Sequence, residues 1–512
     1  MLVKTFGAAV AGIDAIHITI EVDISRGIRF FLVGLPDNAV KESQQRIESV
    51  FRLFGYAWPG RKIVINMAPA DTRKEGSAYD LPLAIGILAA DEQISSDRVG
   101  DYLMMGELSL DGSLKPIKGA LPIAICAKEN DFKGIILPSA NAREASVVEG
   151  LEVYGAEDIG QVIGFLNREL QLEPVKFDLE RELMGHASSH EMDLADVKGQ
   201  ESVKRALEVA AAGGHNMIMI GAPGSGKSMI AKRLATILPP MQLSEALETT
   251  KIHSVAGKMN GERALLTQRP FRSPHHTISS IALVGGGSYP QPGEISLAHN
   301  GVLFLDELPE FSRTVLEVLR QPLEDREITI SRAKVSLKYP ASFMLVASMN
   351  PCPCGYYNHP DKECTCSPGM VQKYLSRISG PLLDRIDIHI EVVPVPFEKL
   401  ASGPQAERSE DVRGRVIKAR DIQHLRFKDY PSVHCNAQMS SKLLRKYAVP
   451  DVAGASILRN AMEKLGLSAR AYDRILKLSR TIADLEGSEK ISAHHVAEAV
   501  QYRSLDRSGW AG

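Results

Sequence analysis

The segment Gly221–Ser228 (GAPGSGKS) holds glycines, a lysine and a serine at the spacing G-x-x-x-x-G-K-S. An apolar run, Met217–Ile220, precedes it, and a helix-forming run, Met229–Leu238, follows it. In this setting the glycines let backbone N–H groups turn inward around phosphates, and the helix amino end adds its positive dipole. We expect Lys227 to reach the β- and γ-phosphates and the Ser228 hydroxyl to hold Mg²⁺. The residues predicted to surround the nucleotide phosphates are Gly221, Ala222, Pro223, Gly224, Ser225, Gly226, Lys227 and Ser228.

A second motif, GVLFLDE, bears on hydrolysis, because a phosphate-binding loop by itself indicates only nucleotide binding. Its apolar residues Val302–Leu305 predict a buried strand that ends at two carboxylates. We expect Asp306 to complete the Mg²⁺ shell and Glu307 to orient or deprotonate the attacking water. A strand that merely ends in two acidic residues is the simpler alternative, and the loop upstream disfavours it.

Asn350 and three arginines are further candidates for phosphoryl transfer. The apolar run Phe343–Ser348 predicts another buried strand, and Asn350 follows it, where a polar side chain would position the water. Arg385 lies in LLDRID, and Arg470 and Arg474 lie in LSARAYDRILKLSR. Arginines on separate elements offset charge on a transferring phosphoryl group, one often from a neighbouring subunit. From spacing alone, a surface ion pair is the more common role of each arginine.

Four of the six cysteines crowd into one short loop with the pattern C-x-C, nine residues, C-x-C. Four thiolates are the preferred set for a structural zinc ion, and such a loop has little core of its own to order it. The predicted zinc ligands are Cys352, Cys354, Cys364 and Cys366. His359 is an alternative to one sulfur, and unliganded or redox-active thiols are the alternative to zinc. Cys126 and Cys435 are predicted to be packing residues.

Length and composition limit the number of domains and the class of protein. Its 512 residues suffice for about three domains, and 44% apolar with 24% charged residues is typical of globular proteins. The net charge of -2 excludes nucleic-acid binding by overall charge, so such binding requires a local basic patch. The longest uncharged apolar run, Leu81–Ala90, is too short to span a bilayer, and from the residues at the start we expect no secretory signal. We therefore expect a cytoplasmic protein.

The predicted fold class is a multidomain α/β protein with a P-loop core. Residues 1–168 alternate strand-like and helix-like runs, including Ile16–Val22, Asn38–Leu53 and Lys62–Met67. Asp111-Gly112, between two alternating runs, predicts a hairpin whose turn uses positive φ angles at this pair. The remaining expected divisions are a linker at 169–192, the core at 193–393, a connector at 394–411 and a helical domain at 412–512.

A family resemblance rests on five long motifs, which are DVKGQESVKRALEVAAAGGHNMIMIGAPGSGKSMIAKRL, PFRSPHHTISS, GEISLAHNGVLFLDELPEF, ASMNPCPCG and LLDRIDIHIEV. Together they resemble the magnesium-chelatase-like AAA+ ATPases of the ComM/YifB type, over nearly the whole chain. The resemblance implies an ATP- and Mg²⁺-dependent homo-oligomeric ring, expected to be a hexamer. It also implies sensor 1 at Asn350, an arginine finger at Arg385 and sensor 2 at Arg470. Ala222 stands where the family usually has Pro, and its backbone N–H remains available to a phosphate.

The first domain resembles the proteolytic domain of Lon-type proteases through APADTRKEGSAYDLPLAIGIL and GELSLDGSLKPIKGALPIA. That chemistry needs a serine nucleophile and a lysine base within hydrogen-bond reach. The nucleophile position falls on Ala78 and the lysine position on Leu121. Ser77 and Lys118 are displaced along the chain, which turns each to another face. We therefore expect a non-catalytic scaffold.

The segment REITISRAKVSLKYP predicts a hairpin between the second and third nucleotide motifs. The resemblance places such a hairpin in a ring pore, where Arg332 and Lys334 would contact single-stranded or branched DNA; a solvated, charged tip is the alternative. Arg272, His275 and His276 are candidates for DNA or subunit contacts. The favoured function is a DNA motor for branch migration in recombination or natural transformation. A metal-chelatase-like protein remodeller and a scaffold or protease are the alternatives.

Overall fold

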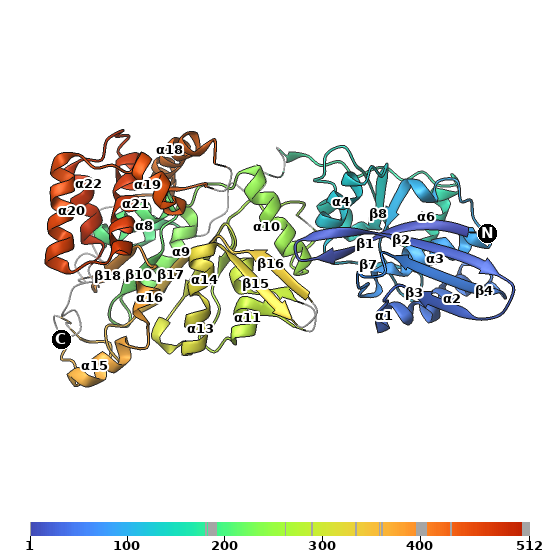
Figure 1. Cartoon of the computed structure of the whole chain (residues 1–512), viewed down its shortest axis with the longest axis horizontal. Coiled ribbons are helices and arrows are strands. Elements are labelled where there is room, and N and C mark those ends of the chain that lie inside the picture. The colour runs from blue at the N-terminus through green and yellow to red at the C-terminus, as the bar shows by residue number, and fades with distance from the viewer. Residues whose placement is uncertain are drawn as a thin grey trace.

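A computed structural model describes residues 2–179, 182, 192–261, 263–287, 290–332, 335–357, 359, 362–395, 407–430 and 433–503. The molecule is elongated, with an amino-terminal α/β unit at one end, a helical carboxy-terminal unit at the other and a second α/β unit between them (Figure 1). In the described part of the chain, no helix has the length and apolar character needed to cross a membrane.

The amino-terminal unit is built on a seven-stranded sheet in the order β3-β4-β2-β1-β5-β8-β9. The pairs β1-β2 and β2-β4 are antiparallel, and the remaining pairs are parallel. Alternate residues of β2 are buried, as expected for a strand with one face on a core. The strands are β1 (Leu2–Ala11), β2 (Asp14–Ser25), β3 (Phe30–Val33), β4 (Lys62–Ala68), β5 (Tyr102–Met104), β8 (Gly134–Pro138) and β9 (Glu152–Ala156). The strands predicted at Ile16–Val22 and Lys62–Met67 are confirmed within β2 and β4.

Helices cover this sheet, and α3 is buried on every side, which explains its long uncharged apolar run. The helices are α1 (Asn38–Lys41), α2 (Ser43–Leu53), α3 (Asp80–Ala90), α4 (Ala120–Glu129), α5 (Ser139–Ala145) and α6 (Ile159–Leu166). The predicted hairpin is present as β6 (Glu107–Leu108) paired with β7 (Leu114–Lys115). Its expected turn conformation is wrong in one respect: of the Asp-Gly pair, only Gly112 has a positive φ, at 80°. The longer connection between these short strands removes the need for a second left-handed residue.

The central unit is a five-stranded sheet in the order β11-β14-β17-β10-β18, and all of its pairs are parallel. Its strands are β10 (Met217–Ile220), β11 (Phe271–Arg272), β14 (Val302–Leu305), β17 (Met344–Met349) and β18 (Ile388–Glu391). The strands β10, β14 and β17 are fully buried and apolar except for Ser348 of β17, because helices cover both faces of a parallel sheet. The main helices around it are α8 (Glu201–Gly213), α9 (Lys227–Ile237) and α10 (Leu243–Val255).

Shorter elements complete the central unit. Between β11 and β14 lie α11 (Ser280–Val284), β12 (Gly285–Gly286), β13 (Gln291–Pro292) and α12 (Glu294–Leu297). After β14 come α13 (Arg313–Val318), α14 (Arg320–Asp325) and the antiparallel hairpin of β15 (Glu327–Arg332) and β16 (Val335–Pro340). After β17 come α15 (Pro368–Leu375) and α16 (Gly380–Leu383). The hairpin predicted from REITISRAKVSLKYP is therefore confirmed.

The carboxy-terminal unit consists of helices, as predicted. They are α18 (Ser409–Phe427), α19 (Ser441–Tyr447), α20 (Val452–Leu465), α21 (Ala469–Leu485) and α22 (Ala493–Gln501). Apolar residues of α8 and α9 share one core with α18 and α21, so this unit is packed onto the central sheet.

The amino-terminal and central units also contact each other directly. The backbone N–H of Gly119 donates to Ser254 O at 3.1 Å, and Lys251 forms an ion pair with Asp14 at 3.0 Å. At the tip between β1 and β2, Ile13 packs against the core cluster that includes Leu337 of β16 at its margin. The β1-β2 tip and the β15-β16 hairpin lie side by side (Figure 1).

Part of the segment expected to be a linker is also packed. Val175 N–H donates to Val153 O at 2.8 Å, and Phe177 and Leu179 pack against a small apolar cluster containing Leu121 and Met241. Most of residues 180–191 lie outside the described part of the chain.

Candidate nucleotide site and cysteine cluster

The strand order of the central sheet brings the three nucleotide motifs to one edge. Strand β17 lies between β10 and β14, with Ile220 opposite Met349 and Leu305 opposite Ala347. Since the carboxyl ends of parallel strands meet at the same edge, the residues that follow each strand become neighbours. Gly221, Asn350 and Asp306 therefore begin three adjacent loops.

Lys227, the first residue of α9, points back into this edge. Its Nζ donates to Gly221 O at 2.7 Å, Ala222 O at 3.0 Å and Asn350 Oδ1 at 3.1 Å. Burial lowers the pKa of Lys227, while the carboxylates of Asp306 and Glu307 oppose that shift. The ammonium group is thus held among oxygen acceptors, and phosphate oxygens are acceptors of the same kind.

Ser228 and Asp306 lie in direct contact. The Ser228 hydroxyl donates to Asp306 Oδ2 at 2.6 Å, and the Ser348 hydroxyl donates to Asp306 Oδ1. Hydroxyl and carboxylate oxygens are the ligands that Mg²⁺ prefers, so this pair fits the metal that the motifs imply. Ser348 is not among the residues predicted from the sequence, although its position near the end of β17, two residues before Asn350, could have indicated it.

Glu307 is exposed to solvent, with 58% of its side chain accessible, and its backbone has a φ of 52°. Its backbone N–H donates to Asp306 Oδ1 at 3.0 Å. Among the described residues, His276 lies beside it, with Nδ1 3.8 Å from Glu307 Oε2. His276 was predicted to contact DNA or another subunit. The fold places it beside the residue predicted to act on water, and the ring centroids of His276 and His275 lie 4.0 Å apart.

The three arginines occupy different environments. Arg385 is only 7% exposed; one Nη donates to Pro381 O at 2.6 Å and the other to Glu324. Arg470 is 55% exposed and lies 4.0 Å from Asp384. Arg474 is mostly buried and pairs with Asp387 at 3.0 Å. Among the described residues, none of the three forms a hydrogen bond or ion pair with the loop Gly221–Ser228.

The basic groups expected at DNA are only partly described. Arg332 ends β15 opposite Val335, and its side chain lies outside the described part of the structure, as does all of Lys334. Arg272 is engaged with Glu294, which accepts two hydrogen bonds from its guanidinium at 2.6 and 2.7 Å.

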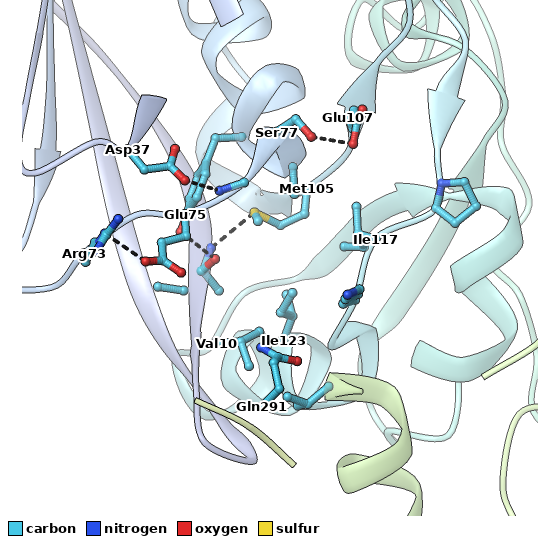
Figure 2. Close-up of a pocket in the computed structure, with 18 residues that line it drawn as sticks. Val10, Asp37, Arg73, Glu75, Ser77, Met105, Glu107, Ile117, Ile123 and Gln291 are labelled. Carbon is cyan, nitrogen blue, oxygen red and sulfur yellow. Dashed lines mark hydrogen bonds and ion pairs between the residues drawn. The ribbon is translucent and has the colours of Figure 1, made fainter. Parts of the chain in front are cut away.

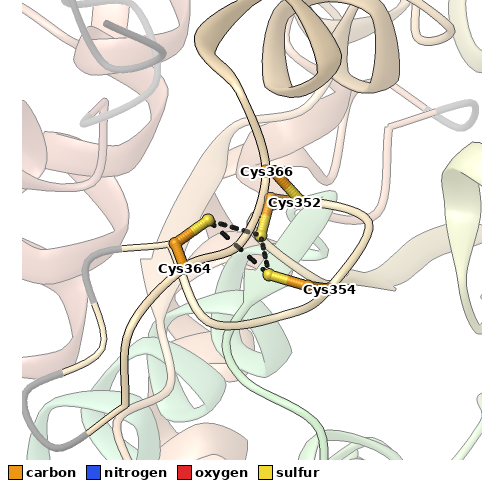
Figure 3. Close-up of side chains that lie close together, drawn as sticks. All are labelled: Cys352, Cys354, Cys364 and Cys366. Carbon is orange, nitrogen blue, oxygen red and sulfur yellow. Dashed lines mark hydrogen bonds between the residues drawn. The ribbon is translucent and has the colours of Figure 1, made fainter.

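The four clustered cysteines converge after β17 (Figure 3). The Sγ atom of Cys352 lies 3.3 Å from that of Cys354 and 3.7 Å from that of Cys364, and the Cys354 and Cys364 sulfurs are 3.6 Å apart. Four sulfurs at about 2.3 Å around one tetrahedral zinc ion lie about 3.8 Å from each other, so the set fits this metal. Burial opposes ionisation of Cys354, but hydrogen bonds from Tyr356 N–H and Cys352 outweigh it and lower its pKa to about 6. The group of sulfurs that could hold a metal ion comprises Cys352, Cys354, Cys364 and Cys366.

His359 is not a member of this group, and its ring instead packs against Tyr356 at 5.6 Å. The two remaining cysteines, Cys126 and Cys435, are buried in other parts of the fold.

A cavity of about 470 Å³ opens in the amino-terminal unit where the Lon resemblance places its motifs (Figure 2). Ser77 and Lys118 line it together with Ala78, so the expectation that each turns to another face is wrong, whereas Leu121 is fully buried in α4. The Ser77 hydroxyl donates to a carboxylate oxygen of Glu107. Ser77 therefore has a carboxylate partner, and the expected Ser-Lys positions hold Ala78 and Leu121.

Three family models match the chain in succession. "Subunit ChlI of Mg-chelatase" matches residues 20–141, "Magnesium chelatase, subunit ChlI" matches 193–400, and "Magnesium chelatase, subunit ChlI C-terminal" matches 406–503.

Individual relatives of the chain indicate the same family. Competence protein ComM of Haemophilus influenzae is 44% identical over 509 residues, which is 99% of this chain and 98% of that protein. The uncharacterized protein YifB of Salmonella typhimurium is 44% identical over 502 residues, covering 98% of this chain and 96% of that protein. The magnesium-chelatase 38 kDa subunit of Rhodobacter capsulatus is 25% identical over 59% of this chain and 83% of that protein. The chain therefore belongs to the magnesium-chelatase-like family, in its ComM/YifB type.

Proposed function

We propose that this protein is an AAA+ ATPase that hydrolyses ATP with Mg²⁺. The observation that carries the proposal is the meeting of Lys227 with Asn350 and of Ser228 with Asp306 at one sheet edge. Lys227 and the loop N–H groups bind the β- and γ-phosphates, and bound Mg²⁺ supplies charge neutralisation there. Glu307, the exposed carboxylate beside Asp306, orients or deprotonates the water, and Asn350 positions it.

The protein works as a ring of identical subunits, most simply a hexamer. In this proposal Arg385 is the arginine finger and Arg470 is sensor 2, and both neutralise charge on the transferring phosphoryl group. Arg470 is exposed and free to reorient, whereas Arg385 must leave Glu324 and Pro381 O to reach a neighbour's nucleotide. Contacts with the neighbouring subunit at the ring interface would replace the partners that Arg385 gives up.

The substrate of the motor is DNA, single-stranded or branched, and the activity is branch migration during recombination or uptake of transforming DNA. Two observations support this assignment. The similarity to Competence protein ComM extends over 99% of the chain, and the β15-β16 hairpin is inserted in the chain between β14, which ends at Asp306, and β17, which is followed by Asn350. In this proposal the hairpin moves with the nucleotide site because the chain on either side of it leads to strands of that site. Arg332 and Lys334 contact the phosphates of the DNA backbone.

The remaining parts have supporting roles in this proposal. Residues 1–168 form a Lon-like, non-catalytic domain, joined by 169–192 to the AAA+ core at 193–393. A connector at 394–411 leads to the helical lid domain at 412–512. A structural zinc ion held by the four-cysteine group orders the loop after Asn350. We propose that the protein acts in the cytoplasm.

A protein-remodelling ATPase without DNA activity is the second candidate. It is favoured by the match of the core to the magnesium-chelatase subunit models. The two candidates differ in what stimulates ATP turnover.

The test is ATP hydrolysis by the full-length protein alone, with single-stranded DNA and with a branched junction. DNA-stimulated turnover is expected, with Glu307→Gln as the control that binds ATP but does not hydrolyse it. Turnover that ignores both DNAs would favour the remodelling ATPase. If the protein hydrolyses no ATP alone or with either DNA, the ATPase assignment itself is wrong.

A further inference from the structure

A second polar cavity lies at the edge of the central sheet opposite to the P-loop. Gly214, Gly301 and Met344, which line it, lie at the amino ends of β10, β14 and β17. The facing wall comes from the carboxy-terminal unit, through Arg420 of α18 and Cys435. The cavity measures about 50 Å³, which exceeds the space that one water molecule requires and is far smaller than a nucleotide.

The lining of this cavity carries more positive than negative charge. It includes the guanidinium groups of Arg269, Arg326 and Arg420 but a single carboxylate, that of Glu245. Glu245 is already neutralised, because its two oxygens accept hydrogen bonds from Arg269 at 2.8 and 3.0 Å. Among the described residues, neither Arg326 nor Arg420 forms an ion pair, although Asp387 attracts Arg326 and Glu245 attracts Arg420 from a greater distance.

The hydrogen bonds of Arg420 go to backbone oxygens and to Cys435, and the carboxylate of Glu245 attracts it without forming an ion pair. Its terminal nitrogens donate to Ala211 O at 3.1 Å and His434 O at 3.4 Å, while its Nε is buried with no hydrogen-bond acceptor. The residue is 93% buried, being 7% exposed. Cys435 lies beside it: a Cβ added to Gly214 would lie 2.7 Å from Cys435 Sγ and 3.3 Å from an Arg420 Nη. A thiol is a weak acceptor and a poor counter-charge for arginine.

Arg326, on the side of the cavity formed by the central unit, likewise has weak hydrogen bonds and, among the described residues, no ion pair. It donates to Ser342 Oγ at 3.3 Å and to Ala437 O at 3.4 Å, which are long hydrogen bonds to neutral groups. Outside the cavity lining, Lys477 donates to the same Ala437 oxygen at 2.9 Å and adds positive charge, while the buried carboxylate of Asp387, already paired with Arg474, attracts both Lys477 and Arg326. Burial lowers the pKa of both Arg326 and Arg420, yet a guanidinium remains protonated in proteins. Buried charges of one sign are costly unless an opposite charge accompanies them.

We propose that this cavity binds one small inorganic anion of the size of chloride, held between Arg326 of the core and Arg420 of α18. A halide fits the volume, supplies the missing charge and accepts hydrogen bonds from several donors at once. The bound anion ties the carboxy-terminal helices to the central sheet at a point remote from the nucleotide. This inference is independent of the proposed function and does not require ATP or DNA.

The test is the thermal stability of the full-length protein in sodium chloride and sodium bromide against sodium gluconate at equal ionic strength. Because an anion bound only by the folded state raises stability with the logarithm of its concentration, halides should raise Tm by about 2 °C per tenfold increase above half-saturation. Gluconate is too large for the cavity and should not produce this rise. Equal Tm values in halide and gluconate at every concentration would overturn the proposal.

Two variants locate the effect. Arg420→Met should abolish the halide-dependent rise, whereas Arg459→Met, an exposed arginine of α20, should retain it. Since Arg420→Met also removes buried contacts, Arg326→Gln is the milder second variant and should weaken the rise. A rise that survives both substitutions places the halide elsewhere and contradicts the site. Crystals soaked in bromide provide a direct check, with an anomalous peak expected between the two guanidinium groups and its absence counting against the proposal.

Discussion

Gly355 of the cysteine loop lies directly against Pro223 of the P-loop. Gly355 has φ 84°, and a Cβ built on it would lie 2.6 Å from Pro223 Cγ. The four-cysteine group begins immediately after Asn350, so one loop follows the predicted sensor and supports the phosphate-binding loop from outside. The order of the cysteine loop and the shape of the nucleotide site are therefore linked through this contact.

Replacing Gly355 with alanine should weaken ATP binding. Alanine is strained at this φ, and its methyl group would displace Pro223, at a combined cost on the order of 1.4 kcal/mol, which is about a tenfold rise in Kd. Calorimetric titration with a non-hydrolysable ATP analogue measures this change. Gly369→Ala is the matched control, because nothing lies within 4 Å of its added Cβ. Unchanged affinity in Gly355→Ala would show that the contact does not shape the P-loop.

The cysteine group should hold about one zinc ion per chain. The double substitution Cys352→Ser and Cys354→Ser should release the metal, lower Tm and reduce ATP affinity, because the loop that supports Pro223 loses its order. Elemental analysis of protein prepared without chelators measures the metal. Cys126→Ser, at a buried cysteine outside the group, should keep the zinc. Metal-free wild-type protein would leave the convergence of the four sulfurs without this explanation.

Lys227→Ala and Glu307→Gln should separate binding from turnover. Lys227 pairs with phosphates in the ground state, so its loss should abolish measurable ATP affinity. Glu307 acts on water, so its loss should leave the Kd of ATP unchanged and lower kcat by about 100-fold or more. Binding and steady-state hydrolysis measured on both variants distinguish these effects. Normal turnover by Glu307→Gln would reassign the base.

Arg385 should act on the nucleotide of an adjacent subunit. Mixing Arg385→Ala chains with Lys227→Ala chains should then restore part of the turnover, since each supplies what the other lacks. Glu324→Gln is the control for a purely structural role, because it breaks the ion pair of Arg385 and leaves the guanidinium in place. If the finger assignment is right, Glu324→Gln keeps its turnover. Equal losses in Arg385→Ala and Glu324→Gln, with no recovery on mixing, would indicate that the pair only stabilises the fold.

Arg332→Ala combined with Lys334→Ala should uncouple DNA binding from ATP hydrolysis. With a net charge of -2, the chain has to bind DNA through local basic groups, and removing two of them should flatten the salt dependence of the affinity. Basal hydrolysis should persist, because neither residue belongs to the nucleotide site. DNA affinity at two salt concentrations provides the measurement. Lys338→Ala is the control, since this lysine of β16 is paired with Glu327 at 2.8 Å. Affinity and salt dependence that match the wild type would move the DNA path away from the hairpin.

Local patterns in the sequence were enough to predict several elements with their ends. Met217–Ile220 and Val302–Leu305 are strands at the residues expected, because each is a continuous apolar run bounded by polar motif residues. The β15-β16 hairpin followed from its period-two alternation, and the cysteine group followed from residue type and spacing. Such features depend on interactions between residues close in the chain. The double positive φ predicted for Asp111-Gly112 was wrong because the length of the loop, set by where the strands pair, decides the turn.

Only the tertiary structure decided how distant segments meet. Strand β17 follows β14 in the chain but pairs with both β14 and β10, and this order places Asn350 beside Lys227. The same folding sets His276 next to Glu307 and pairs Arg385 with Glu324, and neither partner is specified by the motifs. It also brings Arg326 and Arg420 to one cavity in the seam between two units. These contacts depend on strand order and on the docking of whole helices, which side-chain periodicity along a single segment does not specify.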